Sequence, residues 1–536
     1  MLRMVLRCCA LLAPVIIFGL AGLAAADDAA PLHAQIDKLI EAKAGGAVAG
    51  PATDGEFLRR VYLDLAGRAP SVEETRAFLA DPAADKCEKL IDKLLAGGDH
   101  VRRMTQVFHV MLMERLGDHA EWQKFLTASF EANKPWDQMV REILSPDGEN
   151  ETTRGSALWY TKRLEHYGEN PVDIPGMVRD VGRHFLGIDV QCAQCHDHLF
   201  VDDYKQEFYH GMLAFVGNTT IRTDLSFPAV GLKPLDKKIE YMSVFLQKPE
   251  AVGPKLPGGQ EVEIPTFAKG EEFQQPPDKK TKNPGVPKFN TLKLLGEQLP
   301  RAENQLFTKN IANRLWWLMQ GRGLVHPLDL THKANPASHA ELLDLLASEL
   351  AAHQFDMRWL IREIALSQTY QRSGVLAEEA LPQSYRAALE KPLSSEQMLA
   401  SIQQALGDGK PLAIDLSAKS WTDWQTRFDK ALANPAREPE VGHNPTVKAA
   451  LFLMHDTTFL GWLKPTGENL TTRLIKETDA AKVADELYVS VLSRPPSVDE
   501  TTAVAEYLTP RADHREQAVC NLVWSLIASN EFCTNH

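Results

Sequence analysis

The chain has 536 residues, a formal net charge of −13 and 24% charged residues, which is the composition of an ordinary folded globular protein. This length exceeds what one compact core usually holds, so we expect more than one domain. The acidic balance, with no face rich in lysine and arginine, argues against nucleic acid as a partner.

The N-terminus has the pattern of a secretory signal peptide. Arg3 and Arg7 form a short basic region, residues 8–22 are an apolar run, and three alanines precede Asp27. We therefore predict that residues 1–26 are cleaved near Ala26 and that the protein is periplasmic or otherwise exported. No later segment approaches about 18 uninterrupted apolar residues, so the mature chain should have no transmembrane span. An uncleaved N-terminal anchor is the alternative.

After an N-terminal segment, residues 27–53, helical spacing of apolar residues predicts a helical domain over residues 54–216. Phe57, Val61 and Leu65 show this spacing at its start. Within the domain, residues 191–198 read QCAQCHDH and contain one C-x-x-C-H pattern. This pattern is the attachment signature of a c-type haem.

The chemistry of haem c needs these residue types at this spacing. The thiols of Cys192 and Cys195 can each form a thioether to one vinyl group, and His196 then meets the iron as its proximal ligand. Haem c is installed outside the cytoplasm, which agrees with the predicted export. We therefore predict one covalent haem c, held by Cys192, Cys195 and His196.

The distal ligand of the iron is less defined by the sequence. Met212 is the preferred candidate and would raise the reduction potential relative to a second histidine. His210, His184 and Met177 are alternatives, whereas His198 follows the motif too closely to reach the opposite face of the porphyrin.

Two other interpretations of the same residues remain open. Cys192, Cys195, His196 and His198 offer four potential zinc ligands, although adjacent ligands at 195 and 196 are awkward for one tetrahedral ion. Alternatively, Cys192 and Cys195 form a disulfide or a redox pair, and the histidines are only hydrogen-bonded. Either interpretation suits a non-enzymatic cell-envelope scaffold.

Residues 217–290 change in character, because proline and glycine become frequent and helical periodicity ends. Residues 239–246 predict a strand, residues 261–264 predict a shorter one, and residues 274–288 contain four prolines typical of a linker. We interpret residues 217–290 as a β-containing insertion and linker.

Helical patterns resume after this insertion, and residues 291–536 are predicted to form a second helical domain. Its apolar stripes include Phe307, Ile311 and Leu315. The predicted fold class is therefore mainly α, with two helical domains and a small β-containing insertion between them. Cys520 and Cys533 are candidates for a disulfide in an oxidising compartment, which would leave Cys87 unpaired.

An internal similarity links the two ends of the chain. Residues 61–75 match residues 487–501, and in each copy an apolar helix ends at Arg-x-Pro. A serine then precedes a glutamate by three residues, which is a capping box. The same helix–turn–helix hairpin is predicted near each end, with a structural role.

Further segments complete a resemblance that spans most of the mature chain: residues 57–67, 192–198, 313–316, 321–325, 366–370, 492–496 and 524–532. In these segments the chain resembles the exported, cytochrome-c-like proteins of unknown function that are abundant in planctomycetes and related bacteria. Those proteins pair an N-terminal cytochrome-like domain with a C-terminal planctomycete-specific domain. The resemblance implies the fold and the location, and it implies no particular reaction.

No nucleophile elbow, zinc-protease, P-loop or dinucleotide-binding pattern is present, and no paired carboxylates indicate a glycoside hydrolase. The sequence therefore leaves open whether the protein is an enzyme. We predict an exported c-type haem protein in periplasmic electron transfer or redox chemistry, with a periplasmic redox partner. The alternative is the envelope scaffold with a structural metal or disulfide site.

Overall fold

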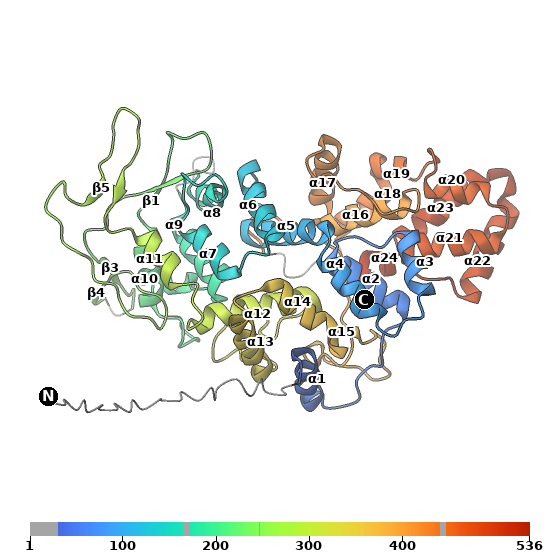
Figure 1. Cartoon of the computed structure of the whole chain (residues 1–536), viewed down its shortest axis with the longest axis horizontal. Coiled ribbons are helices and arrows are strands. Elements are labelled where there is room, and N and C mark those ends of the chain that lie inside the picture. The colour runs from blue at the N-terminus through green and yellow to red at the C-terminus, as the bar shows by residue number, and fades with distance from the viewer. Residues whose placement is uncertain (1–29, 166–171, 246, 440–445) are drawn as a thin grey trace, which may run out of the picture.

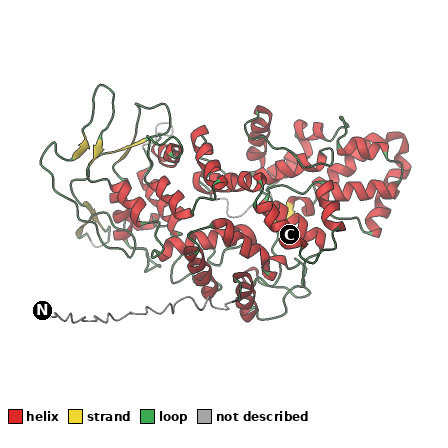
Figure 2. Ribbon diagram, in the orientation of Figure 1, coloured by secondary structure: helices red, strands yellow, loops and turns green. Residues whose placement is uncertain are grey.

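The computed structural model describes residues 30–165, 172–245, 247–439 and 446–536 (Figure 1). The protein is 54% helical and its sheets are all small and two-stranded, which confirms the mainly α fold (Figure 2). No helix in the described ranges is long and apolar enough to cross a membrane. The predicted signal peptide lies outside the described residues.

The helices of the first half form a continuous series before the insertion. They are α1 (Leu32–Lys43), α2 (Asp54–Leu65), α3 (Val72–Ala80), α4 (Lys86–Leu95), α5 (Gly98–Met113), α6 (Ala120–Glu131), α7 (Trp136–Leu144), η1 (Arg154–Ala157), α8 (Leu158–Leu164), α9 (Ile174–Val181), η2 (Gly182–Leu186), η3 (Gln191–Gln194) and α10 (Gln206–Val216).

The insertion forms three antiparallel strand pairs at one end of the molecule (Figure 1). They are β1 (Thr219–Ile221) with β2 (Val230–Leu232), β3 (Ile239–Met242) with β4 (Pro249–Val252), and β5 (Phe273–Gln275) with β6 (Val286–Pro287). The strand predicted at 239–246 is therefore confirmed in its first half.

The second short strand, predicted at 261–264, is wrong. The segment runs as a loop in which the Val262 N–H donates to the Pro254 carbonyl at 2.8 Å. Pro265 follows and has no N–H, so a strand ladder cannot continue beyond it.

The helices of the second half follow the insertion directly. They are α11 (Thr291–Gln298), α12 (Gln305–Gln320), α13 (Ala340–Ala352), α14 (Met357–Leu366), α15 (Gln368–Gln371), η4 (Pro382–Ser384), α16 (Ser395–Leu406), α17 (Lys419–Leu432), α18 (Val447–His455), α19 (Thr457–Trp462), α20 (Leu470–Lys476), α21 (Ala480–Leu492), α22 (Val498–Leu508), η5 (Thr509–His514), α23 (Arg515–Ile527) and α24 (Asn530–Cys533), with β7 (Lys391–Pro392) paired to β8 (Thr534–Asn535).

Buried apolar side chains form two cores. The first core gathers residues between Leu32 and Tyr385, so helices on both sides of the insertion pack together. The second core gathers residues between Leu393 and Phe532, and Leu63 of α2 joins it. The core thus divides near residue 390, and α2 contacts both parts.

The two predicted hairpins are confirmed as α2–α3 and α21–α22. Gly67 and Ser493 occupy equivalent positions and are both left-handed, with φ of 71° and 61°. The arginine that follows each of them, Arg68 or Arg494, forms an ion pair at 2.8 Å with the glutamate of the next capping box. The duplicated sequence therefore encodes the same turn twice.

The candidate disulfide between Cys520 and Cys533 is not formed, because both thiols are free. The Cys520 sulfur lies 3.2 Å from the Leu463 carbonyl, and the Cys533 sulfur lies 3.5 Å from the Ile527 carbonyl. Each thiol thus contacts a backbone carbonyl instead of the other thiol. Cys87 is also free.

Candidate functional site

The C-x-x-C-H motif lies on the short 3₁₀ helix η3, just before α10. Cys192 and Cys195 are exposed free thiols, whereas Ala193 between them is buried and anchors the turn. Cys192 lies on η3 and Cys195 is the residue that follows its end. Both thiols are therefore open to solvent.

His196 follows the turn with its ring held in one orientation. Its Nδ1 lies 2.6 Å from the Asp197 carbonyl, and its ring centroid lies 4.7 Å from that of Phe245. A carbonyl only accepts, so Nδ1 carries the proton and donates it. Nε2 therefore keeps its lone pair, and a metal ion can bind a histidine through that nitrogen.

The motif is fixed from behind by the β3–β4 pair and by α10. The Val244 N–H donates to the Cys195 carbonyl at 3.1 Å. From α10, Nε2 of His210 lies 3.2 Å from the Gln194 carbonyl, and the His210 ring stacks on Tyr241 at 4.4 Å. These contacts hold the backbone at Gln194 and Cys195.

Apolar side chains around the motif are unusually exposed. Phe200 is 86% exposed and Phe245 is 64% exposed, and Leu199 and Val244 are also exposed. Large contiguous apolar patches on a soluble protein mark surfaces that bind a ligand or a partner. The motif therefore has exposed apolar side chains next to it on both sides of the chain, from 199–200 and from 244–245.

The structure places the distal-ligand candidates differently from one another. Met212 is 1% exposed and belongs to the first apolar core. It follows His210 by two positions on α10, a rotation of about 200°, so it points away from the face that contacts Gln194. Met177 and His184 are also buried in the first part of the molecule. Among these candidates, His210 faces the motif.

The four-ligand zinc arrangement is not preassembled. In the described part of the chain, Cys192, Cys195, His196 and His198 do not bring three ligand atoms within 4.8 Å of one another. Nδ1 of His198 accepts the backbone N–H of Phe200 at 3.1 Å, which occupies that nitrogen.

A buried group of polar residues lies elsewhere in the first part of the molecule, and of its members the sequence singled out only His184, as a candidate distal ligand. Glu114, Asp180 and His184 bring three potential ligand atoms within 4.8 Å of one another. Arg183 approaches Glu114 at 2.5 Å and Asp180 at 3.3 Å, and Arg163 approaches Asp180 at 2.8 Å. We call these five residues the buried charge network.

Hydrogen bonding explains why the network suits ion pairing better than a metal. The Trp159 indole N–H can only donate, and it donates to Nδ1 of His184 at 3.3 Å. The proton of His184 is therefore on Nε2, which lies 3.4 Å from Glu114. Neither ring nitrogen keeps a lone pair for a metal, and the carboxylates are already occupied by guanidinium groups.

Burial and the neighbouring charges shift the pKa values of the network. Burial lowers the pKa of His184, so the ring is neutral. Burial opposes ionisation of Glu114, but its contacts with His184 and Arg183 outweigh burial and lower the pKa of that carboxyl. Burial also opposes ionisation of Asp180, but Arg163 and the other positive groups nearby together outweigh burial and lower the pKa of that carboxyl.

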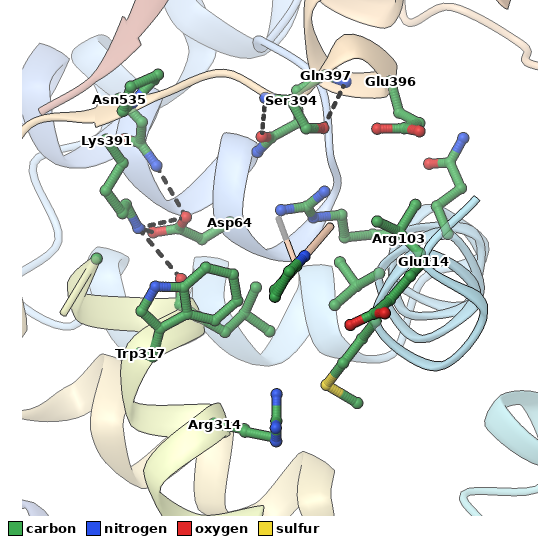
Figure 3. Close-up of a pocket in the computed structure, with 18 of the residues that line it drawn as sticks. Asp64, Arg103, Glu114, Arg314, Trp317, Lys391, Ser394, Glu396, Gln397 and Asn535 are labelled. Carbon is green, nitrogen blue, oxygen red and sulfur yellow. Dashed lines mark hydrogen bonds and ion pairs between the residues drawn. The ribbon is translucent and has the colours of Figure 1, made fainter. Parts of the chain in front are cut away.

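The network borders a cavity of about 160 Å³ that lies between the two cores (Figure 3). Asp64 of α2 lies at its wall and is fully paired. Its carboxylate accepts from Lys391 at 2.6 Å, from Asn535 at 2.8 Å and from the Tyr370 hydroxyl at 2.9 Å. The cavity is therefore lined by charged groups brought together from distant parts of the chain.

Comparison with known families finds two matches in the chain. Residues 35–221 match a family described as PSCyt2, a protein of unknown function (DUF1549), and residues 293–408 match PSD1, a protein of unknown function (DUF1553). The chain combines both domains. The first match contains the C-x-x-C-H motif and the buried charge network. Neither the curated proteins nor the solved structures include a match to this chain.

Proposed function

We propose that the protein is an exported c-type haem protein that takes part in periplasmic electron transfer or redox chemistry. Cys192 and Cys195 would carry the thioethers, and His196 would be the proximal ligand. When bound, the haem supplies one-electron chemistry, and the protein supplies its attachment, orientation and surroundings. The proposal includes cleavage of the signal peptide near Ala26.

The observation that carries this proposal is the arrangement of the three motif side chains. Both thiols are free and exposed, Cys192 on η3 and Cys195 directly after it, and the hydrogen bond to the Asp197 carbonyl leaves Nε2 of His196 available. In a metal-bound histidine, the ring nitrogen that does not bind the metal usually donates its N–H to a carbonyl or carboxylate, which fixes the ring orientation. The residues present therefore fit the group.

The surface around the motif supports the same proposal. Phe200, Phe245 and Leu199 are exposed, although such large apolar side chains are favoured inside a protein. A porphyrin attached to the thiols would remove part of this apolar surface from water. Its remaining exposed edge would be the place where a periplasmic redox partner exchanges electrons.

The distal position is a choice between two residues of α10. The Met212 side chain belongs to the apolar core and would not be free to hold the group. His210 faces the motif, and its Nδ1 is buried without a hydrogen-bond partner among the described residues. The geometry therefore favours His210 over Met212 as distal ligand.

The test is expression of the full chain in a host with cytochrome c maturation, followed by haem staining after denaturation. We expect stain in the wild type and none in Cys192→Ser/Cys195→Ser. Cys87→Ser/Cys520→Ser is the matched control, since it removes two other free thiols, and it should keep the stain. Absence of stain in the wild type, with the maturation system active, would contradict the proposal. Zinc analysis of that protein would then test the scaffold alternative.

The ligands of the iron need a second measurement, the absorption spectrum of the stained protein. His196→Ala should keep covalent haem but lose the spectrum of its proximal coordination. His210→Gln should change the distal coordination, while Met212→Leu, a swap of similar volume, should leave the spectrum unchanged. The reverse result would restore Met212 as distal ligand.

A further inference from the structure

The cavity between the two cores contains the guanidinium of Arg103, which has no ion-pair partner among the described residues. Arg103 belongs to α5, lines the cavity and is only 7% exposed. Its stem packs against Gly67, where a Cβ atom would lie 2.8 Å from Cδ of Arg103. The missing side chain at position 67 thus makes room for Arg103.

No described residue forms a hydrogen bond or an ion pair with Arg103. Its Nε is buried without a partner. Figure 3 shows its guanidinium among the lining residues with no dashed line reaching it. Burial lowers the pKa of Arg103, and Asp64 and Glu396 oppose this shift without making an ion pair. A buried charge without a partner is costly, so such a group is expected to serve a ligand.

The carboxylates around the cavity are engaged with other cations. Asp64 pairs with Lys391, Glu396 pairs with Arg115 at 3.0 Å, and Asp329 pairs with Arg314. Glu114 pairs with Arg183 of the buried charge network, and Glu390 is exposed to solvent at the edge of the cavity. Arg103 is therefore the positive charge left for an anion from outside.

The rest of the lining is apolar enough to hold a carbon skeleton. Trp317 of α12 and Val107, Val110 and Met111 of α5 line the cavity. Its volume of about 160 Å³ is close to that of an engineered apolar cavity, about 150 Å³, that binds benzene. An inorganic anion would leave these side chains without contacts, whereas a compact organic acid would fill the space.

We propose that this cavity binds a small organic carboxylate, with its carboxylate paired to Arg103 and its carbon body against Trp317. Gln397 of α16 also lines the cavity and belongs to the second part of the molecule. The bound acid therefore contacts both cores and stabilises their association. This site is independent of the haem motif and does not require haem.

The test is calorimetric titration of the purified full chain with benzoate, whose ring matches the cavity volume. Benzyl alcohol has the same ring without the charge, and inorganic phosphate has the charge without the ring. We expect saturable 1:1 binding of benzoate, with benzyl alcohol weaker by about 10- to 100-fold because the charge-assisted hydrogen bonds are lost. Arg103→Gln should weaken benzoate by a similar factor.

Two variants keep the test decisive. Arg102→Gln changes the neighbouring arginine, which pairs with Asp99 and does not line the cavity, and it should leave benzoate binding unchanged. Arg103→Lys retains the charge without the planar guanidinium and should bind benzoate with intermediate affinity. Without ligand, Arg103→Gln should raise the unfolding temperature, because it removes an unpaired buried charge.

Several results would overturn the proposal. They are no saturable benzoate binding by the wild type, equal binding of benzyl alcohol or of phosphate, and benzoate binding that survives Arg103→Gln. A lower unfolding temperature in both Arg103→Gln and Arg103→Lys, with benzoate binding unaffected in Arg103→Lys, would assign the guanidinium a structural role instead.

Discussion

The C-x-x-C-H motif and the buried charge network place reactive groups in opposite surroundings. Cys192, Cys195 and His196 lie within five residues of sequence and at the surface, near exposed apolar side chains. Glu114 and Asp180 are distant in sequence, buried and paired with arginines. Under the proposed function the surface motif receives a haem, whereas the arginines of the network neutralise its own carboxylates. Changes in the C-x-x-C-H motif should therefore affect function and have little effect on stability. Changes in the buried charge network should mainly lower stability.

The largest expected effect is on the stability of the network. Arg183→Met removes the cation that contacts Glu114, Asp180 and Asp329. Asp180 keeps Arg163 and Asp329 keeps Arg314, so the buried Glu114 carboxylate is the one left without a cation. We expect the free energy of unfolding to fall by about 3–5 kcal/mol in urea denaturation.

Arg362→Met is the control, because Arg362 pairs with Asp92 and Glu88 at the surface. Its cost should stay within about 1 kcal/mol. Equal costs for Arg183→Met and Arg362→Met would show that the buried network carries no special share of the stability.

The second expected effect is acid sensitivity of the network. The pKa of His184 is lowered in the fold, so below its ordinary value of 6.5 the unfolded chain takes up a proton that the folded chain refuses. The pKa values of Glu114 and Asp180 are also lowered, which adds the same dependence below about 4.5. The free energy of unfolding should therefore fall as pH falls from 6.5 toward 4. A urea midpoint that stays constant over this range would contradict the assigned charge states.

A smaller effect on stability should distinguish two buried tryptophans, Trp159 and Trp136. Trp159→Phe removes the N–H that His184 accepts and should lower the free energy of unfolding by about 1–3 kcal/mol beyond the change in packing. Trp136→Phe is the matched comparison, because the buried Trp136 N–H has no partner among the described residues. A cost for Trp136→Phe as large as that for Trp159→Phe would show that the hydrogen bond to His184 is unimportant.

The smallest expected effect on stability belongs to the surface motif. Phe245→Ser should change the free energy of unfolding of the haem-free chain by no more than about 0.5 kcal/mol, because the side chain is already exposed. In the haem-bearing protein the same change should lower the reduction potential, since more water around the iron favours its oxidised, more positive state. Redox titration checks this, and an unchanged potential would mean that Phe245 does not cover the haem.

Local patterns in the sequence predicted the helices, the β3 strand and the two hairpins. The hairpin signal is strong because the capping boxes at Ser71 and Ser497 need residues at fixed short spacing. The loop at 261–264 shows the limit of such patterns, since alternation over four residues does not supply a partner strand. The free thiols of Cys520 and Cys533 show it again, because pairing depends on tertiary positions.

The C-x-x-C-H motif could be found in the sequence because its residues are neighbours in the chain, and the haem that it indicates stays a prediction. The network and the cavity could not be found there, because Glu114, Asp180 and Asp329 come together only through packing of α5, α9 and the loop after α12. One signal was available: Asp64 and Arg103 interrupt otherwise apolar helical stripes. Burial of such residues requires a partner, and only the structure shows that Asp64 has one and Arg103 does not.

The most direct test of the central claim is the intact mass of the denatured protein, produced with cytochrome c maturation, followed by peptide mapping of residues 191–198. The account predicts one added haem mass, located on the peptide that contains Cys192 and Cys195, with neither thiol available for alkylation. The bare polypeptide mass, with both thiols alkylated, would contradict it.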